Sequence, residues 1–198
     1  MNRTSKVLAE EVIRYAVQES IEVKTRLLQQ HVAVITHLTE ILISALRAGS
    51  KVVLFGNGGS AADAQHVAAE LVNRFQLDRD ALAAIALTTD TSILTSASND
   101  FDFEQIFSRQ VRALVQGGDV VIGISTSGNS YNVINGVIAA KEKGATTVGF
   151  VGRSGGELKD LVDICCHVPS NNTARIQEAQ ITIWHAIVEV VEREMSDE

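Results

Sequence analysis

The stretch KVVLFGNGGS, residues 51–60, changes the character of the chain within a few positions. Its first half, Lys51 to Phe55, is short and apolar, as is typical of a buried strand. Its second half contains three glycines and ends at Ser60, where a longer segment of helical spacing begins. A buried strand that passes through a glycine turn into a helix is the first unit of a parallel sheet, because a crossover has to connect each parallel strand to the next.

The same alternation continues to the end of the chain. Further strands are predicted at residues 82–87, 119–125, 146–151 and 162–168, and helices at 60–74, 103–115, 130–143 and 173–195. Short apolar strands that alternate with helices predict an α/β fold, a doubly wound five-stranded parallel sheet with right-handed connections. No repeat or linker interrupts the pattern, so we expect a single domain over residues 1–198.

Upstream of the first strand the chain is helical. Neither glycine nor proline occurs from Asn2 to Ala48, and apolar residues recur at helical spacing from Leu27 to Leu46. The pattern predicts one long broken helix or two consecutive helices. So much apolar helix has to be buried, and we therefore expect residues 1–48 to form a helical N-terminal extension that packs on the domain and on neighbouring subunits.

Composition narrows the range of functions. The chain of 198 residues can bury a sizeable core, and its 24 acids against 17 bases give a net charge of −7. This charge argues against nucleic acid as a partner, because binding to the phosphate backbone needs a basic surface. We expect no membrane association, since neither a signal-peptide core nor a run near the ~18 apolar residues of a membrane span is seen. Cys165 and Cys166 match no metal or redox spacing, and reduced thiols indicate a cytoplasmic protein.

Two turns at the carboxyl ends of predicted strands are candidate ligand sites, because ligands of parallel sheets bind at those ends. In residues 56–60, glycines let the backbone approach a ligand and the next helix offers free amides, although a tight turn would explain the same residues. In residues 125–130, four hydroxyls and Gly128 precede a helix. Ser127 or Asn129 would suit a cap, but a cap needs only one side chain. The surplus predicts a loop that holds a phosphate dianion without lysines.

The predicted helix after the first turn contains a candidate metal-binding pair. His66 and Glu70 are four residues apart, so they lie on one helical face and can present two ligands to one divalent metal. Such a pair is often only a surface contact. Its position less than three turns beyond Ser60 favours a site, because both side chains would overlook whatever the glycine turn binds.

The motif GISTSGNS, residues 123–130, is similar to the phosphate-binding loop of the SIS (sugar isomerase) superfamily, and residues 56–60 are similar to its first substrate loop. Residues 98–101, 106–109 and 174–178 resemble the phosphoheptose isomerases of that superfamily. The resemblance implies an SIS domain and an isomerase that converts D-sedoheptulose 7-phosphate to D-glycero-D-manno-heptose 7-phosphate through an enediol(ate). That reaction is the first step of ADP-heptose and other nucleotide-heptose biosynthesis.

The resemblance also implies the site residues and one zinc ion per site. The implied metal ligands are His66, Glu70, Gln177 and His185. Glu70 and His185 would be catalytic, with Glu70 moving the carbon-bound proton and His185 moving protons at the oxygens, an order that the sequence does not decide. Hydroxyls would hold the phosphate, and side-chain amides and a carboxylate would orient the sugar. The implied substrate-binding residues are Asn57, Gly58, Gly59, Ser60, Glu70, Asn99, Asp100, Ser125, Thr126, Ser127, Ser130 and Gln177.

Gln177 and His185 raise a geometric difficulty. Eight residues of one helix span ~12 Å, so both side chains would have to reach far towards one metal. Either Gln177 precedes the regular helix or a neighbouring subunit contributes to the site. The resemblance implies a homotetramer with active sites at subunit interfaces. Ala61, Ala62 and Ala174 depart from residues found in some members, which bears on fine specificity more than on the reaction class.

Three alternatives stand beside the isomerase. A non-catalytic SIS protein that binds the bacterial replication initiator shares the fold and much of these loops but lacks the full acid/base set. A sugar-phosphate-binding regulator is the second, although no DNA-binding segment accompanies this chain. Another SIS isomerase or an amino-sugar phosphate enzyme is the third. Glu70 and His185 favour an enzyme, and the set of four implied ligands favours the heptose branch.

Overall fold

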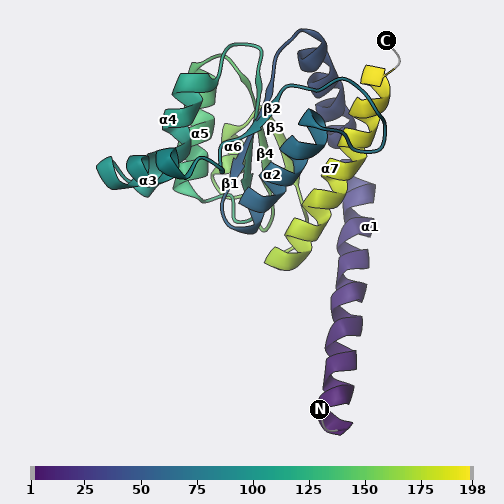
Figure 1. Cartoon of the computed structure of the whole chain (residues 1–198). Helices are drawn as coiled ribbons and strands as arrows, with labels where there is room; N and C mark the ends of the chain where they lie inside the picture. Colours follow the sequence, from purple (N-terminus) through teal and green to yellow (C-terminus); the bar gives the residue numbers. More distant parts are fainter. Residues whose placement is uncertain (1–2, 197–198) are drawn as a thin grey trace.

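The computed structural model describes residues 3–196 and contains one five-stranded sheet within them (Figure 1). The strands lie in the order β2-β1-β3-β4-β5, and every neighbouring pair is parallel. This confirms the predicted α/β fold. Residues 1–2 and 197–198, which the single-domain prediction includes, lie outside the described residues. The strands are β1 (Val52–Gly56), β2 (Ala84–Ala86), β3 (Val120–Ser125), β4 (Thr146–Val151) and β5 (Ile164–His167).

Helices cover both faces of the sheet, which divides its side chains between two cores (Figure 1). Along β1, Val52 and Leu54 belong to the core with α1, α2 and α7, whereas Val53 and Phe55 belong to the core with α4 and α5. Successive side chains of a strand alternate between its faces, so a strand buried on both sides is apolar throughout. The helices are α1 (Arg3–Arg47), α2 (Gly59–Val72), α3 (Thr91–Asp100), the 3₁₀ helix η1 (Phe103–Gln105), α4 (Ile106–Leu114), α5 (Tyr131–Glu142), α6 (Leu158–Leu161) and α7 (Thr173–Ser196).

Two of these helices, α3 and α6, were not expected from the sequence. In α3 only Ala97 is buried among the described residues, so the segment has no apolar stripe to mark it as a helix. Its start is fixed by Asp90, whose side chain accepts a hydrogen bond from the Ile93 N–H at 2.9 Å. Helix α6 is a single short turn, and the helix expected at 103–115 is divided into η1 and α4.

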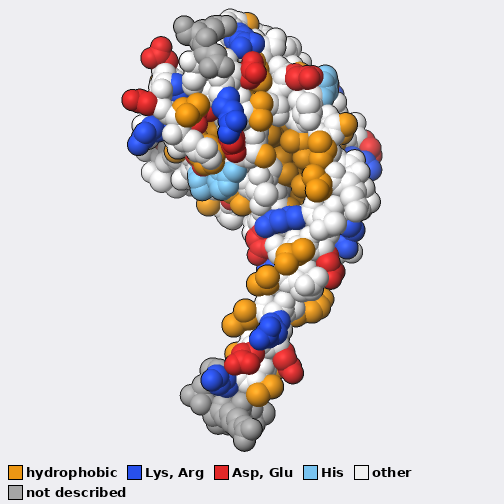
Figure 2. Space-filling model, turned by 90° about the vertical axis from the view of Figure 1, so that its right-hand side faces the viewer, with side chains coloured by type: hydrophobic (Ala, Val, Ile, Leu, Met, Phe, Trp, Pro, Cys, Tyr) orange, Lys and Arg blue, Asp and Glu red, His pale blue; other side chains and the backbone are white. Residues whose placement is uncertain are grey.

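Helix α1 is continuous over 45 residues, so the expectation of a broken helix or two helices is wrong. Its second half packs on α7, with Leu38 and Leu42 buried. Its first half projects away from the domain (Figure 1) and carries apolar side chains along its surface (Figure 2). No helix among the described residues combines the length and apolar character needed to cross a membrane. The exposed large apolar residues of the projecting half are Val7, Leu8, Val12, Ile13, Tyr15, Val17 and Ile21.

Candidate active site

Helices α2 and α7 bring three ionisable side chains together. His66 and Glu70 share one face of α2, as their spacing predicts, and His185 comes from α7. Glu70 Oε1 lies 3.1 Å from His66 Nε2 and 3.4 Å from His185 Nε2. The two imidazole rings also contact each other, with centroids 5.3 Å apart. Residues far apart in the sequence thus meet at one carboxylate oxygen.

These three side chains form a donor set that fits a divalent metal. Their ligand atoms, two imidazole nitrogens and one carboxylate oxygen, all lie within 4.8 Å of one another. Glu70 is 8% exposed, and among the described residues its Oε2 has no hydrogen-bond partner. A buried carboxylate oxygen without a donor is unfavourable, so this group has unused capacity to bind a cation or to take a proton. Imidazole and carboxylate ligands of this kind are typical of zinc and related divalent metals.

Gln177 lies inside α7, so the alternative that it precedes the regular helix is wrong. It stands eight residues before His185, which is ~12 Å along the helix axis. Its amide packs against the first glycine turn, because a Cβ at Gly59 would collide with the Gln177 side chain. Gln177 therefore borders the first predicted substrate loop, and its contact with a metal stays a prediction.

Asp63, which sequence reasoning missed, extends the face of α2 that carries His66 and Glu70. Its Oδ2 is buried and has no hydrogen-bond partner within the described part of the chain. Burial raises the pKa of Asp63, and the nearby His66 opposes that rise. The available signal was the spacing: Asp63, His66 and Glu70 follow one another at intervals of three and four residues.

The serine-rich loop after β3 folds around the side chain of Ser125. The Oγ of Ser125 lies 3.0 Å from the Oγ of Ser130 and 3.4 Å from that of Ser127. It also accepts a hydrogen bond from the Gly128 N–H at 3.1 Å. Ser130 precedes the first turn of α5, and its hydroxyl makes no capping bond to this described helix. The cap position of α5 is thus Ser130, and neither Ser127 nor Asn129, the alternative that the sequence left open. The amino end of α5, all of which is described, has no side-chain cap and is open to an anion.

The first glycine turn adjoins this loop, because β1 and β3 are neighbours with Gly56 opposite Ile124. The side-chain amides of Asn57 and Asn132 exchange two hydrogen bonds of 2.8 Å, which tie the turn to the start of α5. Gly58, with a φ of 56°, precedes α2. Neither α2 nor α5, both within the described chain, has an acid in its first turn. Two helix amino ends thus lie at the carboxyl edge of the sheet, where their dipoles favour an anion.

The loop after β4 covers the serine-rich loop, and this contact was not predicted from the sequence. The Leu158 N–H donates to the Gly128 carbonyl oxygen at 2.9 Å, and the Glu157 N–H donates to Asn129 Oδ1 at 3.0 Å. A Cβ at Gly128, whose φ is +70°, would overlap the carbonyl oxygen of Gly155. Only glycine fits there. The available signal was a second glycine-rich segment, residues 152–156, directly after the fourth predicted strand.

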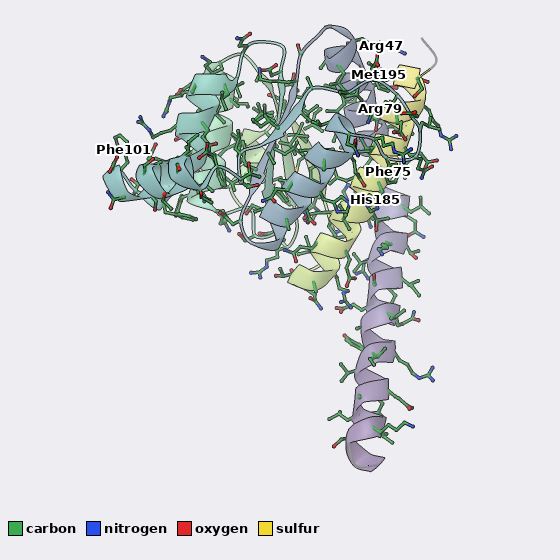
Figure 3. All side chains as sticks on the ribbon, viewed as in Figure 1. Arg47, Phe75, Arg79, Phe101, His185 and Met195 are labelled. Atoms are coloured by element: carbon green, nitrogen blue, oxygen red, sulfur yellow. The ribbon has the colours of Figure 1, made fainter. Side chains whose placement is uncertain are left out.

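The remaining predicted substrate residues are unevenly placed. Ser60 is buried in the first turn of α2, and Thr126 is half-buried in the serine-rich loop. Asn99 and Asp100 lie in the last turn of α3, are exposed, and hydrogen-bond to each other at 2.8 Å. Phe101, the next residue, lies on the side of the molecule opposite His185 (Figure 3). One chain alone therefore does not bring Asn99 and Asp100 to the His66, Glu70 and His185 cluster.

A parallel doubly wound sheet with this serine-rich loop at its carboxyl edge defines an SIS domain, and the family model described as SIS domain matches residues 15–152. Within that family, the chain belongs to the phosphoheptose isomerases. It is 54% identical to the phosphoheptose isomerase of Roseiflexus sp. (strain RS-1) over 182 residues, which cover 92% of this chain and 92% of that relative.

Two solved structures agree with this assignment. The phosphoheptose isomerase from Neisseria gonorrhoeae superposes with a TM-score of 0.89 at 42% identity, over 93% of this chain and 99% of that chain. The phosphoheptose isomerase from Francisella tularensis superposes with a TM-score of 0.91 at 34% identity, over 93% of this chain and 98% of that chain. The structural similarity therefore extends over nearly the whole length of this chain and of each solved structure.

Proposed function

We propose that this chain converts D-sedoheptulose 7-phosphate to D-glycero-D-manno-heptose 7-phosphate, the first step of ADP-heptose and other nucleotide-heptose biosynthesis. The observation that carries the proposal is the meeting of Glu70 Oε1 with the Nε2 atoms of His66 and His185, at 3.1 and 3.4 Å. Aldose–ketose isomerisation needs such a pair, because a proton moves between two carbons while other protons move between oxygens. Relatives that align over 92% of this chain are named phosphoheptose isomerases.

The phosphate of the substrate would bind at the two loops. The amino ends of α2 and α5 would supply amide donors, and the hydroxyls of Ser60, Ser125, Thr126, Ser127 and Ser130 would add further donors. Glu70 lies ten residues beyond Ser60 on α2, which is ~15 Å along the helix axis. The carbonyl and the phosphate stand at opposite ends of a seven-carbon ketose phosphate. An extended substrate would therefore span the two parts of the site.

Proton transfer would fall to Glu70 and His185. Glu70 takes a proton from C1 of the ketose and returns it to C2, while His185 Nε2 passes protons between the two substrate oxygens. The surroundings of the two Glu70 oxygens differ: Oε1 is shared by the imidazoles, and Oε2 has no partner among the described residues. One oxygen is thus available for proton transfer while the other is held by its neighbours.

A zinc ion would be held by His66, Glu70, Gln177 and His185, of which Glu70 and Gln177 would also contact the substrate. When bound, zinc acts as a Lewis acid that stabilises negative charge on substrate oxygens. The donor chemistry of the described cluster supports three of these ligands, His66, Glu70 and His185. Asn57, with its neighbours Gly58 and Gly59, would bring backbone and amide donors to the sugar hydroxyls.

The active sites would lie at subunit interfaces of a homotetramer. Two observations support this. The first half of α1 projects from the domain (Figure 1) and exposes apolar side chains, and packing of residues 1–48 on neighbouring subunits would bury them. Asn99 and Asp100 lie away from His185 in one chain, so a neighbouring subunit would have to bring them to the sugar. The enzyme would act in the cytoplasm, where the free Cys165 and Cys166 stay reduced.

The other SIS functions are less well supported. A non-catalytic protein that binds the replication initiator, or a sugar-phosphate-binding regulator, needs the phosphate loops but has no use for a carboxylate placed between two imidazoles. The acidic balance of the chain also disfavours a nucleic-acid partner. The cluster of Glu70 with His66 and His185 therefore favours the enzyme.

The test is isomerisation of sedoheptulose 7-phosphate by metal-stripped protein, followed by addition of zinc. Little activity is expected from the stripped protein, with recovery when zinc is restored. Activity that is unaffected by chelation would contradict the metal assignment. Absence of isomerisation at any zinc concentration, while the sugar phosphate still binds, would instead favour the non-catalytic alternatives.

A further inference from the structure

A buried ion pair joins α7 to the loop between α2 and β2, beside the proposed active site. Arg79, in this loop, and Glu192, on α7, have side chains only 2% and 1% exposed, and Arg79 Nε lies 3.4 Å from Glu192 Oε1. Arg79, Phe75 and His185 gather on the same side of the molecule (Figure 3). Two charges withdrawn from water are tolerated when they are paired and hydrogen-bonded, so the other contacts of this pair indicate what it holds in place.

Glu192 fixes the backbone of the loop. Its Oε1 accepts a hydrogen bond from the Phe75 N–H at 2.9 Å. Its Oε2 accepts hydrogen bonds from the N–H groups of Gln76 at 2.7 Å and Leu77 at 2.9 Å. The loop held in this way presents the ring of Phe75, which stacks on the His185 imidazole with centroids 5.5 Å apart and an interplanar angle of 17°. Glu192 therefore acts on the orientation of His185 through the loop.

Arg79 fixes the end of α2. Its Nη2 donates to the backbone carbonyl oxygen of Glu70 at 2.8 Å, and its Nη1 donates to that of Leu71 at 2.9 Å. The last carbonyl groups of a helix lack partners within the helix, and a cation beside them is favourable. Helix α2, all of which is described, has no basic residue in its last turn, so Arg79 supplies this charge from the loop.

We propose that Arg79 and Glu192 are positioning residues that set the distance and orientation between Glu70 and His185. The ion pair connects the backbone of Glu70 to the loop whose Phe75 ring rests on His185, so one buried unit controls both groups. This inference rests on the proposed function, because the geometry that it explains is the geometry of that active site. A displacement of ~1 Å between catalytic groups is enough to lower a rate by ~10²-fold.

Glu192→Gln tests the proposal with little change in side-chain shape. The amide would direct its own N–H₂ at backbone N–H groups and leave Arg79 without a counter-charge. We expect kcat to fall by ~10- to 100-fold, and zinc affinity to weaken by a similar factor in a competition titration with a chromophoric chelator. KM should change little, because the phosphate loops lie on other elements.

Asp119→Asn is the matched control. Asp119 is also a buried carboxylate, lies 2.6 Å from the Lys51 ammonium nitrogen, and accepts hydrogen bonds from the N–H groups of Lys51 and Gln116. None of these bonds, all within the described residues, involves α2 or α7. The control should unfold at a lower urea concentration than wild type while keeping its kcat and zinc affinity. Kinetic and titration measurements are made where urea unfolding shows both variants to be folded.

A selective loss of kcat and zinc affinity in Glu192→Gln supports the proposal. Equal kcat and zinc affinity in the two folded variants would overturn it and leave the ion pair with a purely structural role. If Glu192→Gln does not fold, Arg79→Lys decides by the same measurements, since it keeps the charge but loses the planar group that bonds two carbonyls. Wild-type protein that fails to isomerise sedoheptulose 7-phosphate would refute the proposed function alone, because zinc affinity still reports on the positioning.

Discussion

The phosphate end and the chemical end of the proposed site are built in different ways. Residues 56–60 and 125–130 form the phosphate end, and each loop is continuous in sequence and follows a strand of the sheet. The chemical end consists of side chains from α2 and α7 that meet only because these helices pack together. The first end offers neutral amide and hydroxyl donors, whereas the second offers ionisable groups.

This difference means that the two ends should respond to different changes. A backbone change in a loop should weaken phosphate binding and leave the cluster of Glu70, His66 and His185 in place. A change in the cluster or in the packing that holds it should lower kcat while the substrate still binds. Separate effects on KM and kcat would therefore confirm that the ends are independent.

The largest effect should come from Glu70→Gln at the chemical end. The amide keeps the shape of the side chain but cannot take a proton, so kcat should fall by ~10²- to 10⁴-fold. Binding of the phosphate ester, measured by calorimetry, should stay near the wild-type value. Glu189→Gln, at a half-buried position of α7 paired with Arg193, is the control and should keep full activity. Retained activity in Glu70→Gln would remove Glu70 from the chemistry.

The next largest effect should come from Gly128→Ala at the phosphate end. The new Cβ would overlap the carbonyl oxygen of Gly155 and push the serine-rich loop away from the helix amino end. Loss of one hydrogen bond to a charged phosphate, about 1.5–3 kcal/mol, should raise KM by ~10- to 100-fold.

Gly144→Ala is the control for Gly128→Ala. The substitution imposes a similar left-handed strain, since the φ of Gly144 is +73°. The new Cβ, however, would have its nearest neighbouring atom 3.9 Å away and would not collide with it. It should lower stability by about 1–2 kcal/mol without changing KM. A zinc affinity that falls in Gly128→Ala but not in Gly144→Ala would show that the two ends are not independent.

The same difference between the two ends explains which parts of the fold and of the site could be predicted from the sequence. The sheet was predictable because strands buried on both faces are apolar throughout, and the two loops were predictable because glycines and hydroxyls cluster locally. The i, i+4 spacing also placed His66 and Glu70 on one face. The contact between that face of α2 and His185 was implied only by resemblance, because no local sequence pattern indicates which side of α7 packs on α2.

The residues that were missed share this long-range character. Glu192 stands among other charged residues near the end of the chain, and nothing nearby shows that it is buried or that it holds a loop more than a hundred residues earlier. Arg79 and Asn132 are similar, since their partners come from other elements. Helix α3 was missed because a helix with one buried residue has no apolar periodicity.

Removal of the metal, which should abolish most of the activity, should have a smaller effect on stability. A ligand that binds only the folded state stabilises it, and zinc at ten times its Kd should add about 1.4 kcal/mol to the free energy of unfolding. For a chain of this length that corresponds to about 3–6 °C in Tm. Calorimetry with and without chelator should show this shift in wild type and not in His66→Gln. A shift of equal size in His66→Gln would place the metal elsewhere, while phosphate affinity should be unaffected in either protein.

The smallest effect should come from Asp119, at the amino edge of the sheet and outside both ends of the site. Burial alone would raise its pKa, but the bonds from Lys51 and from the Gln116 N–H outweigh burial and hold the pKa below the ordinary 3.8. The folded state therefore binds this proton less readily than the unfolded state, so the stabilisation is full above the ordinary pKa and is lost as the pH falls below it.

Asp119→Asn should accordingly lower the free energy of urea unfolding by about 1 kcal/mol at neutral pH, and by progressively less below pH about 4. The bonds of Asp119 reach neither the phosphate loops nor the packing of α2 on α7, so KM and kcat should keep their wild-type values. If the loss of unfolding free energy in Asp119→Asn stays the same at low pH, the shape of the side chain and not its charge is responsible for the destabilisation. A change in both KM and kcat would show that the two ends of the site are coupled through the sheet that lies between them.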